Sequence, residues 1–310
     1  MNVMESEMSL KLEDVSYIYN KGTEMEVHAL SHINLEIEKG SFVGIIGHTG
    51  SGKSTLVQHF NGLIEPSEGI VSFEGRNLNL LEQDELTAGK RLSKRELKKK
   101  RKELALLLKK HRSKVGLVFQ YPEHQLFEMD ILSDVKFGPS NLSLSEEEIE
   151  ERAKKALSLV GLDETYYERS PFDLSGGQKR RVAIAGVLAL NPEVLILDEP
   201  TAGLDPAGRE EILELITRLR DEVGMTVILV SHSMDDVAEY VDRIIVMNKA
   251  EVAFDDTPRE VFKHYKELEN MGLSAPQMTY IMHDLAEAGF DVDTYAITIE
   301  EACDSIMKNF

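Results

Sequence analysis

The residues with the clearest chemical potential lie in one short glycine-rich segment. In chain order they are Gly47, His48, Thr49, Gly50, Ser51, Gly52, Lys53, Ser54 and Thr55. A glycine, four residues and then Gly-Lys-Ser is the pattern of a phosphate-binding loop when a strand precedes it and a helix follows. Residues 41–46 have the apolar, partly β-branched character of a buried strand, and residues 56–60 favour a helix. Backbone N–H groups and the helix dipole would then hold phosphates. Lys53 would reach the β- and γ-phosphates, and the Ser54 hydroxyl would bind Mg²⁺. The alternative, a glycine-rich turn that matches the pattern by chance, is less favoured.

Two further segments carry polar groups where a ligand could bind. Residues 194–197 form an apolar run that ends at Asp198 and Glu199. Carboxylates at the C-terminal end of a buried parallel strand lie where α/β sheets bind their ligands. The other segment opens a helix predicted over 179–190 and consists of Leu174, Ser175, Gly176, Gly177 and Gln178. It predicts either a second phosphate-binding helix N-terminus or an ordinary glycine-rich helix entry.

The remaining pattern predicts the elements that would position these groups. Period-two alternation over 10–38 predicts antiparallel strands with a turn near residues 20–22. Gln120 and His232 each follow a short apolar run, and the sequence between 130 and 189 is mostly helical. Further strands are predicted at 41–46, 70–73, 115–119, 194–197, 226–230 and 244–247, and helical segments follow from about residue 257. The alternation predicts an α/β fold with a mainly parallel sheet and helices on both faces.

Composition excludes several classes of protein. The 310 residues, 42% of them hydrophobic, suffice for one large domain and a small one. No apolar run approaches the ~18–20 residues that span a bilayer, and the acidic N-terminus lacks the features of an export signal. The single cysteine, Cys303, excludes an internal disulfide and fits a reducing cytoplasm. The formal charge of −20 argues against nonspecific binding of nucleic acid or anionic lipid by the surface as a whole.

One segment departs from this acidic average. Residues 90–114 contain 13 Lys and Arg against two Glu, a net charge of +11. Ser93 and Glu96 form a possible capping box, and leucines recur at roughly helical spacing. The favoured interpretation is a solvated helical insertion with a narrow apolar stripe. The alternative is a basic face that meets anionic lipid headgroups or an acidic partner.

The order of these signals resembles the nucleotide-binding subunit of ABC transporters over about residues 10–250. Residues 47–54 look like Walker A, and 174–178 look like the signature sequence. Residues 194–199 look like Walker B with its catalytic glutamate, and 202–205 look like the D-loop. The resemblance implies a P-loop NTPase ABC cassette, which has a RecA-like parallel sheet, an antiparallel β-subdomain and a helical subdomain. A small C-terminal α-rich domain would follow.

The resemblance also implies a role for each residue. Glu199 would orient and deprotonate the attacking water, His232 would bond to the γ-phosphate of ATP, and Gln120 would contact Mg²⁺ or water and sense the membrane partner. Tyr19, which spacing alone makes a half-buried strand residue, lies where the family places its adenine-stacking aromatic. The residues that hold Mg²⁺ would be Ser54, Gln120 and Asp198. ATP would be sandwiched between the Walker A loop of one cassette and the signature of a second, with contributions from Tyr19, residues 47–55, Ser175, Gly176, Gly177, Gln178 and Asp205.

A narrower resemblance is to the ATPases of energy-coupling factor importers, most like the second of the two paralogous ATPases in vitamin-type modules. It rests on residues 115–127, 137–139, 178–185, 202–203, 273–276 and 298–302. The implied domains are a cassette over 1–250, with a helical subdomain at about 123–190 and the basic insertion at about 80–113, and a C-terminal dimerisation or regulatory domain over 251–310. The basic insertion is longer than expected of the family.

This resemblance implies a location at the cytoplasmic face of the cell membrane and three partners, with no nucleic acid. The partners are a second ATPase, a transmembrane coupling subunit and a substrate-binding membrane subunit. Glu123, Glu128 and Asp130 lie beside apolar residues, which predicts a surface for an arginine-bearing helix end of the coupling subunit. The alternatives are the ATPase of a cobalt or nickel importer and, less favoured, a soluble non-transport ABC ATPase.

Overall fold

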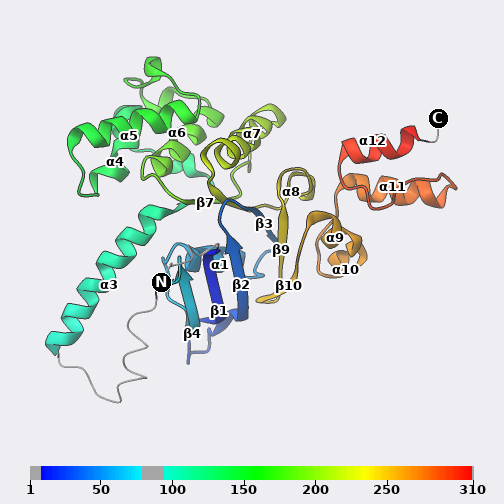
Figure 1. Cartoon of the computed structure of the whole chain (residues 1–310), viewed down its shortest axis with the longest axis horizontal. Coiled ribbons are helices and arrows are strands. Elements are labelled where there is room, and N and C mark those ends of the chain that lie inside the picture. Colours follow the sequence, from blue (N-terminus) through cyan, green and yellow to red (C-terminus); the bar gives the residue numbers. More distant parts are fainter. Residues whose placement is uncertain (1–7, 79–93, 309–310) are drawn as a thin grey trace, which may run out of the picture.

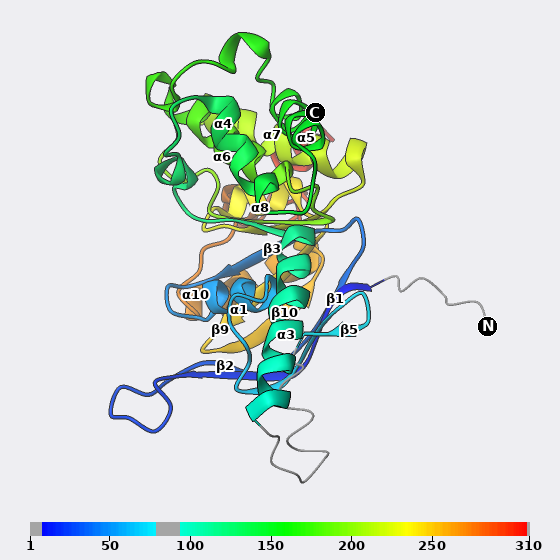
Figure 2. The same cartoon turned by 90° about the vertical axis from the view of Figure 1, so that its left-hand side faces the viewer.

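The computed structural model describes residues 8–78 and 94–308 and arranges them as two sheets surrounded by helices (Figure 1; Figure 2). The larger sheet has the strand order β10-β9-β3-β8-β7-β6, and the smaller has the order β2-β1-β4-β5. The strands of the larger sheet are β3 (Phe42–Gly47), β6 (Val115–Val118), β7 (Val194–Asp198), β8 (Thr226–Val230), β9 (Arg243–Asn248) and β10 (Glu251–Asp256). Those of the smaller sheet are β1 (Met8–Tyr19), β2 (Val27–Glu38), β4 (Glu68–Phe73) and β5 (Arg76–Asn77).

The larger sheet is parallel except for its edge strand β10, which runs antiparallel to β9. The prediction of a mainly parallel sheet is therefore confirmed, as are the two long antiparallel strands on either side of the turn near residues 20–22. No strand was predicted over 251–256, because only Val252 and Phe254 among these six residues are partly buried apolar residues and the alternation is weak. The predicted domain boundary at residue 250 falls between β9 and β10, which pair with each other in the larger sheet. The proposed division between cassette and C-terminal domain is better drawn after Asp256.

The helices of the cassette are α1 (Lys53–Phe60), α3 (Lys94–Lys114), α4 (Ile131–Ser140), α5 (Glu146–Leu159), α6 (Gly176–Leu188), α7 (Pro206–Val223) and α8 (Met234–Tyr240). Short 3₁₀ turns occur at η1 (Pro122–Gln125), η2 (Glu164–Tyr166) and η3 (Pro171–Asp173). Capping boxes at Ser145 and Ser175 explain where α5 and α6 begin, because the serine and the residue at N3 satisfy each other's backbone N–H groups. Within the described residues, no helix has the length and apolar character needed to cross a membrane.

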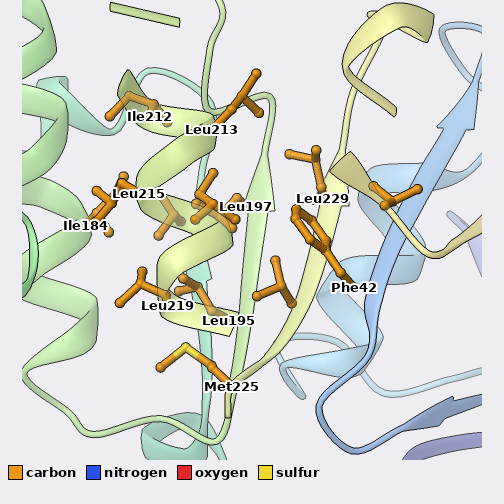
Figure 3. Packing of buried hydrophobic residues seen from close by; sticks show 14 of the residues in the cluster. Phe42, Ile184, Leu195, Leu197, Ile212, Leu213, Leu215, Leu219, Met225 and Leu229 are labelled. Atoms are coloured by element: carbon orange, nitrogen blue, oxygen red, sulfur yellow. The ribbon is translucent and has the colours of Figure 1, made fainter. Parts of the chain in front are cut away.

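Each strand of the larger sheet contributes to two separate cores. Leu195, Leu197 and Leu229 pack with the apolar stripe of α7 on one face, as Figure 3 shows. Ile196 and Ile228 point to the opposite face, where they pack with α1 and the smaller sheet. Since successive side chains of a strand point to opposite faces, a sheet covered on both sides needs continuous apolar strands. This explains the unbroken apolar runs that the sequence shows.

The C-terminal helices are α9 (Pro258–Lys263), α10 (Tyr265–Asn270), α11 (Gln277–Glu287) and α12 (Ile299–Met307). They lie at one end of the molecule's long axis, with α4, α5 and the N-terminal end of α3 at the other (Figure 1). α11 and α12 enclose a small core of Met282, Ala296 and Ala302. Leu273 and Ala275 instead join the main core, so the segment that leads into α11 is anchored to the cassette.

Helix α3 accounts for the C-terminal part of the predicted basic insertion, whose residues 80–93 lie outside the described residues. Leu104 and His111 are buried at 6% and 4% exposure. His111 Nε2 lies 2.8 Å from the carbonyl oxygen of Phe60, and Arg112 Nη2 donates to the carbonyl of Gly62 at 2.6 Å. The C-terminal part of α3 is therefore fixed at the C-terminal end of α1.

We expect the buried His111 to make the protein less stable in mild acid. Burial lowers the pKa of His111 to about 4, from an ordinary value of 6.5. Between these values the unfolded chain binds the proton and the folded chain does not, so the free energy of unfolding falls as pH falls. The expected loss from this residue is about 2 kcal/mol between pH 7 and pH 5.

The measurement is the melting temperature at both pH values for the wild type, His111→Gln and His28→Gln. Glutamine keeps a donor for Phe60 and does not titrate, so His111→Gln should lose less stability in acid than the wild type. His28 is exposed, and its replacement should leave the acid sensitivity unchanged. Identical acid sensitivity in His111→Gln and the wild type would contradict the assignment.

Candidate functional site

One cavity at the C-terminal ends of the parallel strands gathers most of the predicted site residues. It is bounded by the start of β2, the loop before α1 and α1 itself, and the segments that follow β6, β7 and β8. The residues that line it are Tyr19, Val27, His28, Ala29, Thr49, Gly50, Gly52, Lys53, Ser54, Thr55, Gln120, Asp198, Glu199 and His232. Groups as distant in the chain as Tyr19 and His232 therefore share one cavity, and those that follow β6, β7 and β8 meet because parallel strands end at the same edge of the sheet.

The backbone of the glycine-rich loop has the shape of a cradle that side chains would fill. Gly52 has a φ of 109°, and a Cβ there would lie 2.4 Å from the carbonyl oxygen of Ala29. Gly47 would likewise meet the carbonyl of Met247 at 2.4 Å. Ser51 Oγ is buried and has no hydrogen-bond partner among the described residues. A phosphate group fits this loop, since it would supply acceptors to N–H donors curled around an open centre.

Lys53 lies inside the cradle, 7% exposed. Its ammonium donates to the carbonyls of Gly47 at 2.5 Å and His48 at 3.1 Å. Burial lowers the pKa of Lys53, although Glu199 and Asp198 oppose that shift. Burial and the neighbouring Glu199 also raise the pKa of Asp198. Opposite charges thus face one another across the cavity, where phosphates and a divalent cation would balance them.

Glu199 is the centre of a hydrogen-bonded group at the far side of the cavity. Its Oε2 accepts from Gln120 Nε2 at 2.5 Å, and its Oε1 lies 2.7 Å from His232 Nε2. The backbone of Glu199 has a φ of 51°, in the left-handed region that non-glycine residues seldom occupy. Such strain is found where surrounding structure holds a residue in place for function. The other two residues predicted as catalytic, Gln120 and His232, therefore both contact Glu199.

The predicted signature residues and Asp205 lie elsewhere. Ser175, Gly176, Gly177 and Gln178 form the N-terminal end of α6, and Asp205 caps α7 by accepting from Gly208 N at 2.7 Å. Within the described part of the chain, the residues that line the cavity do not include them. Ser175 and Gly176 are exposed, so the N-terminal end of α6 is accessible at the surface of the cassette. Such a helix end is available to a ligand held by another molecule.

Two features of the site were missed by the sequence analysis. The start of β2 lines the cavity beside the phosphate loop with Val27, His28 and Ala29, which no motif marked. Tyr19 stands beside them and its hydroxyl lies 3.3 Å from Thr55 Oγ1. This grouping depends on the pairing of β1 with β2, in which Tyr19 is opposite Val27.

The other missed feature is Arg180, whose side chain is 1% exposed. Its guanidinium donates to both carboxylate oxygens of Glu123, at 3.2 and 2.8 Å, and to the carbonyls of Pro200 and Ala202, at 2.6 and 2.9 Å. Burial opposes ionisation of Glu123, yet these hydrogen bonds hold its pKa below the usual value. The predicted contact of Glu123, Glu128 and Asp130 with an arginine-bearing helix end stays a prediction, and it rests mainly on Glu128 because Arg180 already pairs with Glu123. Asp130 is also engaged, as the N-cap of α4.

Comparison with known proteins identifies the family. A model of the family "ABC transporter" matches residues 30–202. The chain is 51% identical over 302 residues to the "Energy-coupling factor transporter ATP-binding protein EcfA2" of Clostridium perfringens (strain 13 / Type A), covering 97% of this chain and 98% of that protein. This chain is an ABC transporter ATPase of the energy-coupling factor family. A relative of the same name from Clostridium tetani (strain Massachusetts / E88) is also 51% identical, over 304 residues and 98% of both chains.

Solved structures support the same family and the cassette fold. The structure of cbiO1 from Clostridium perfringens, described as part of the ABC transporter complex cbiONQ, matches with a TM-score of 0.70 and 37% identity. It covers 90% of this chain and 99% of that chain. The cassette MJ0796, in a dimeric post-hydrolysis state bound to ADP and Pi, matches with a TM-score of 0.64 and 33% identity, over 80% of this chain and 98% of that one. The predicted P-loop NTPase cassette is confirmed.

Proposed function

We propose that this chain is the ATP-hydrolysing subunit of an energy-coupling factor importer, which drives uptake of vitamins or other micronutrients. The observation that carries the proposal is the single cavity that holds the phosphate loop, Asp198, Glu199, Gln120 and His232 together. The identity of 51% to full-length relatives named as energy-coupling factor ATP-binding proteins supports it. Identity to cbiO1 is lower, at 37%, so the ATPase of a cobalt or nickel importer is the second choice.

ATP would be bound by the loop of residues 47–55 and by Tyr19. Loop N–H groups, Lys53 and the dipole of α1 would hold the phosphates. Lys53 would exchange its bonds to Gly47 and His48 for bonds to phosphate oxygens. The negative charge of the phosphates would stabilise the ammonium form, which burial now destabilises. The Tyr19 ring, beside Val27, His28 and Ala29, would face the adenine.

Mg²⁺ would be held by Ser54, Gln120 and Asp198. Hydroxyl, amide and carboxylate oxygens are the hard donors that Mg²⁺ prefers, and the remaining positions go to water and phosphate. The three residues line one cavity with the phosphate loop, so the donor set fits the ion. Bound Mg²⁺ supplies charge stabilisation at the transferred phosphoryl group.

Hydrolysis would depend on the group around Glu199. The carboxylate would accept a proton from the attacking water, while Gln120 and His232 fix the orientation of the carboxylate through their hydrogen bonds. His232 would also contact the γ-phosphate. Residues 175–178 and Asp205 would complete the shell around nucleotide held by a second ATPase, because these helix ends do not line this chain's own described cavity.

The partner in the membrane would bind beside helix α4. Phe127, Met129 and Phe137 are 56%, 85% and 52% exposed, and the rings of Phe127 and Phe137 meet edge to face with centroids 5.0 Å apart. We call the two phenylalanines the aromatic patch, and Met129 is a further exposed apolar residue in the same segment. Apolar side chains exposed together mark a binding surface, and this one adjoins the loop after Gln120. A transmembrane coupling subunit seated there would hold the chain at the cytoplasmic face of the membrane.

The test is co-expression with the coupling subunit, the substrate-binding membrane subunit and a second ATPase of the family. Phe137→Glu should lose co-purification with the coupling subunit and transport into liposomes, while ATP binding survives. Val223→Glu is the matched control, since Val223 is 49% exposed but lies at the end of α7. Normal assembly and transport by Phe137→Glu would overturn this surface, and absence of ATP-dependent uptake by the wild-type complex would overturn the proposed function.

A further inference from the structure

The cassette fold leaves one part of the chain unexplained, the basic helix α3. Five of its described side chains are exposed lysines: Lys98, Lys99, Lys102, Lys109 and Lys110. Lys99 lies 3.7 Å from Glu103. Within the described residues, no carboxylate pairs with the other four. These ammonium groups repel one another, and an anionic surface against them would relieve the repulsion. Such a cluster is unusual on a chain whose net charge is −20.

The inner face of α3 fixes the direction in which these lysines point. Leu104 and His111 are buried, and Leu108 lies against Gly62 at the end of α1. The ring of His111 meets that of Phe73 in β4 with centroids 5.1 Å apart. A helix held along one side in this way presents its opposite side at a constant orientation. The lysines therefore form a fixed basic surface on the cassette.

This surface lies at the same end of the molecule as the aromatic patch. Figure 1 shows the N-terminal end of α3 and helices α4 and α5 at one end of the long axis, opposite α11 and α12. Figure 2, viewed from that end, shows α3 in the foreground beneath α4. The inference below rests on the proposed function in one respect, since the aromatic patch orients this end toward the membrane.

We infer that the outward face of α3 binds the surface of an anionic phospholipid bilayer. The five described charges are all lysines, whose ammonium groups act as point charges and need no fixed partner geometry. Leu106, exposed at 70% on the same outward side, can enter the headgroup region beside them. The chain as a whole carries a net charge of −20, which such a surface repels, so the attraction would be local to α3. The contact would hold the ATPase close to the bilayer before and during assembly with its membrane subunits.

The experiment measures co-sedimentation of the full chain with phosphatidylcholine vesicles, with and without phosphatidylglycerol. The wild type should bind only vesicles that contain phosphatidylglycerol, and high salt should release it, because screening shortens the reach of surface charge. Replacement of Lys98, Lys102 and Lys109 by Gln should weaken that binding about tenfold or more, given the contribution of each lysine near an anionic surface.

The matched control replaces Lys249, Lys266 and Lys308 by Gln, which changes the net charge equally at exposed positions outside α3. It should bind vesicles as the wild type does, and both variants should bind ATP normally. Equal binding by the two variants, salt-independent binding, or wild-type binding to phosphatidylcholine alone would overturn the inference. Binding of the wild type to single-stranded RNA but not to anionic vesicles would overturn it in favour of a nucleic-acid surface. Vesicle binding by the free chain does not require ATP hydrolysis. Failure of the inference is therefore seen in vesicle binding alone, whereas failure of the proposed function is seen in ATP hydrolysis by the assembled complex.

Discussion

Replacement of Glu199 by Gln is expected to lower ATP hydrolysis in the assembled complex about 10²–10⁴-fold, the usual cost of losing a general base. The glutamine side chain is the same size and can still bond to Gln120 and His232, so the arrangement around it should persist. What is lost is the ability to accept a proton from water. The measurement is the hydrolysis rate at saturating ATP.

ATP binding by Glu199→Gln should be retained or strengthened. Glu199 raises the pKa of the neighbouring Asp198, and removing its charge favours the ionised Asp198 that would hold Mg²⁺. The variant should therefore accumulate as an ATP-bound dimer, which size-exclusion chromatography with light scattering can detect. Glu214→Gln removes an exposed carboxylate on α7 and should hydrolyse ATP as the wild type does. Wild-type turnover by Glu199→Gln would remove Glu199 from the catalytic role.

Replacement of Arg180 by Met is expected to have the largest effect on stability, a loss of about 3–5 kcal/mol in the free energy of unfolding. The change leaves the partly buried Glu123 carboxylate, 16% exposed, and the carbonyls of Pro200 and Ala202 without their donors. Removing one member of a buried ion pair costs more than the pair itself contributes, because the other charge stays desolvated. Urea unfolding of the purified chain at neutral pH measures the loss.

Arg181→Met is the control one residue away. Arg181 lies 3.6 Å from Glu211 and is 24% exposed, so the loss of this ion pair should cost about 1 kcal/mol or less. Combining Arg180→Met with Glu123→Gln should recover part of the stability, since no buried charge is then left alone. If Arg180→Met proves as stable as Arg181→Met, the guanidinium does not hold these elements together.

The position of Arg180 also suggests a role in coupling ATP hydrolysis to transport. Arg180 belongs to α6, which begins at the signature residues, and it bonds to the loop that leads from Glu199 to the D-loop. Its other partner, Glu123, lies in η1, between Gln120 and the aromatic patch. One side chain therefore joins the three segments that would meet ATP, a second ATPase and the membrane partner. Partial loss of Arg180 contacts should uncouple hydrolysis from transport before the fold fails, and the conservative Arg180→Lys variant is suited to show this.

Most strands and helices, and the order of the chemical groups along the chain, could be predicted from local sequence pattern. A glycine loop between an apolar strand and a helix specifies its own backbone shape, because only glycine adopts the φ of Gly52 without strain. Apolar runs without alternation predicted strands buried on both faces, and the two cores on either side of Leu195 and Ile196 confirm that prediction. The edge strand β10 was missed because its alternation is weak and its outer residues are polar.

Which charged side chains pair with one another could not be predicted from the sequence, because the partners lie far apart in the chain. The contact between Glu123 and Arg180 could not be predicted from local pattern, because 57 residues separate them. The sequence also does not distinguish an exposed carboxylate from a buried one. The same holds for His111, which the sequence shows within a run of lysines and which the fold buries against Phe60. The cavity wall formed by Val27, His28 and Ala29 likewise depends on strand pairing. Local sequence fixes backbone preferences, whereas the pairing of distant polar groups follows from how the sheets and helices pack.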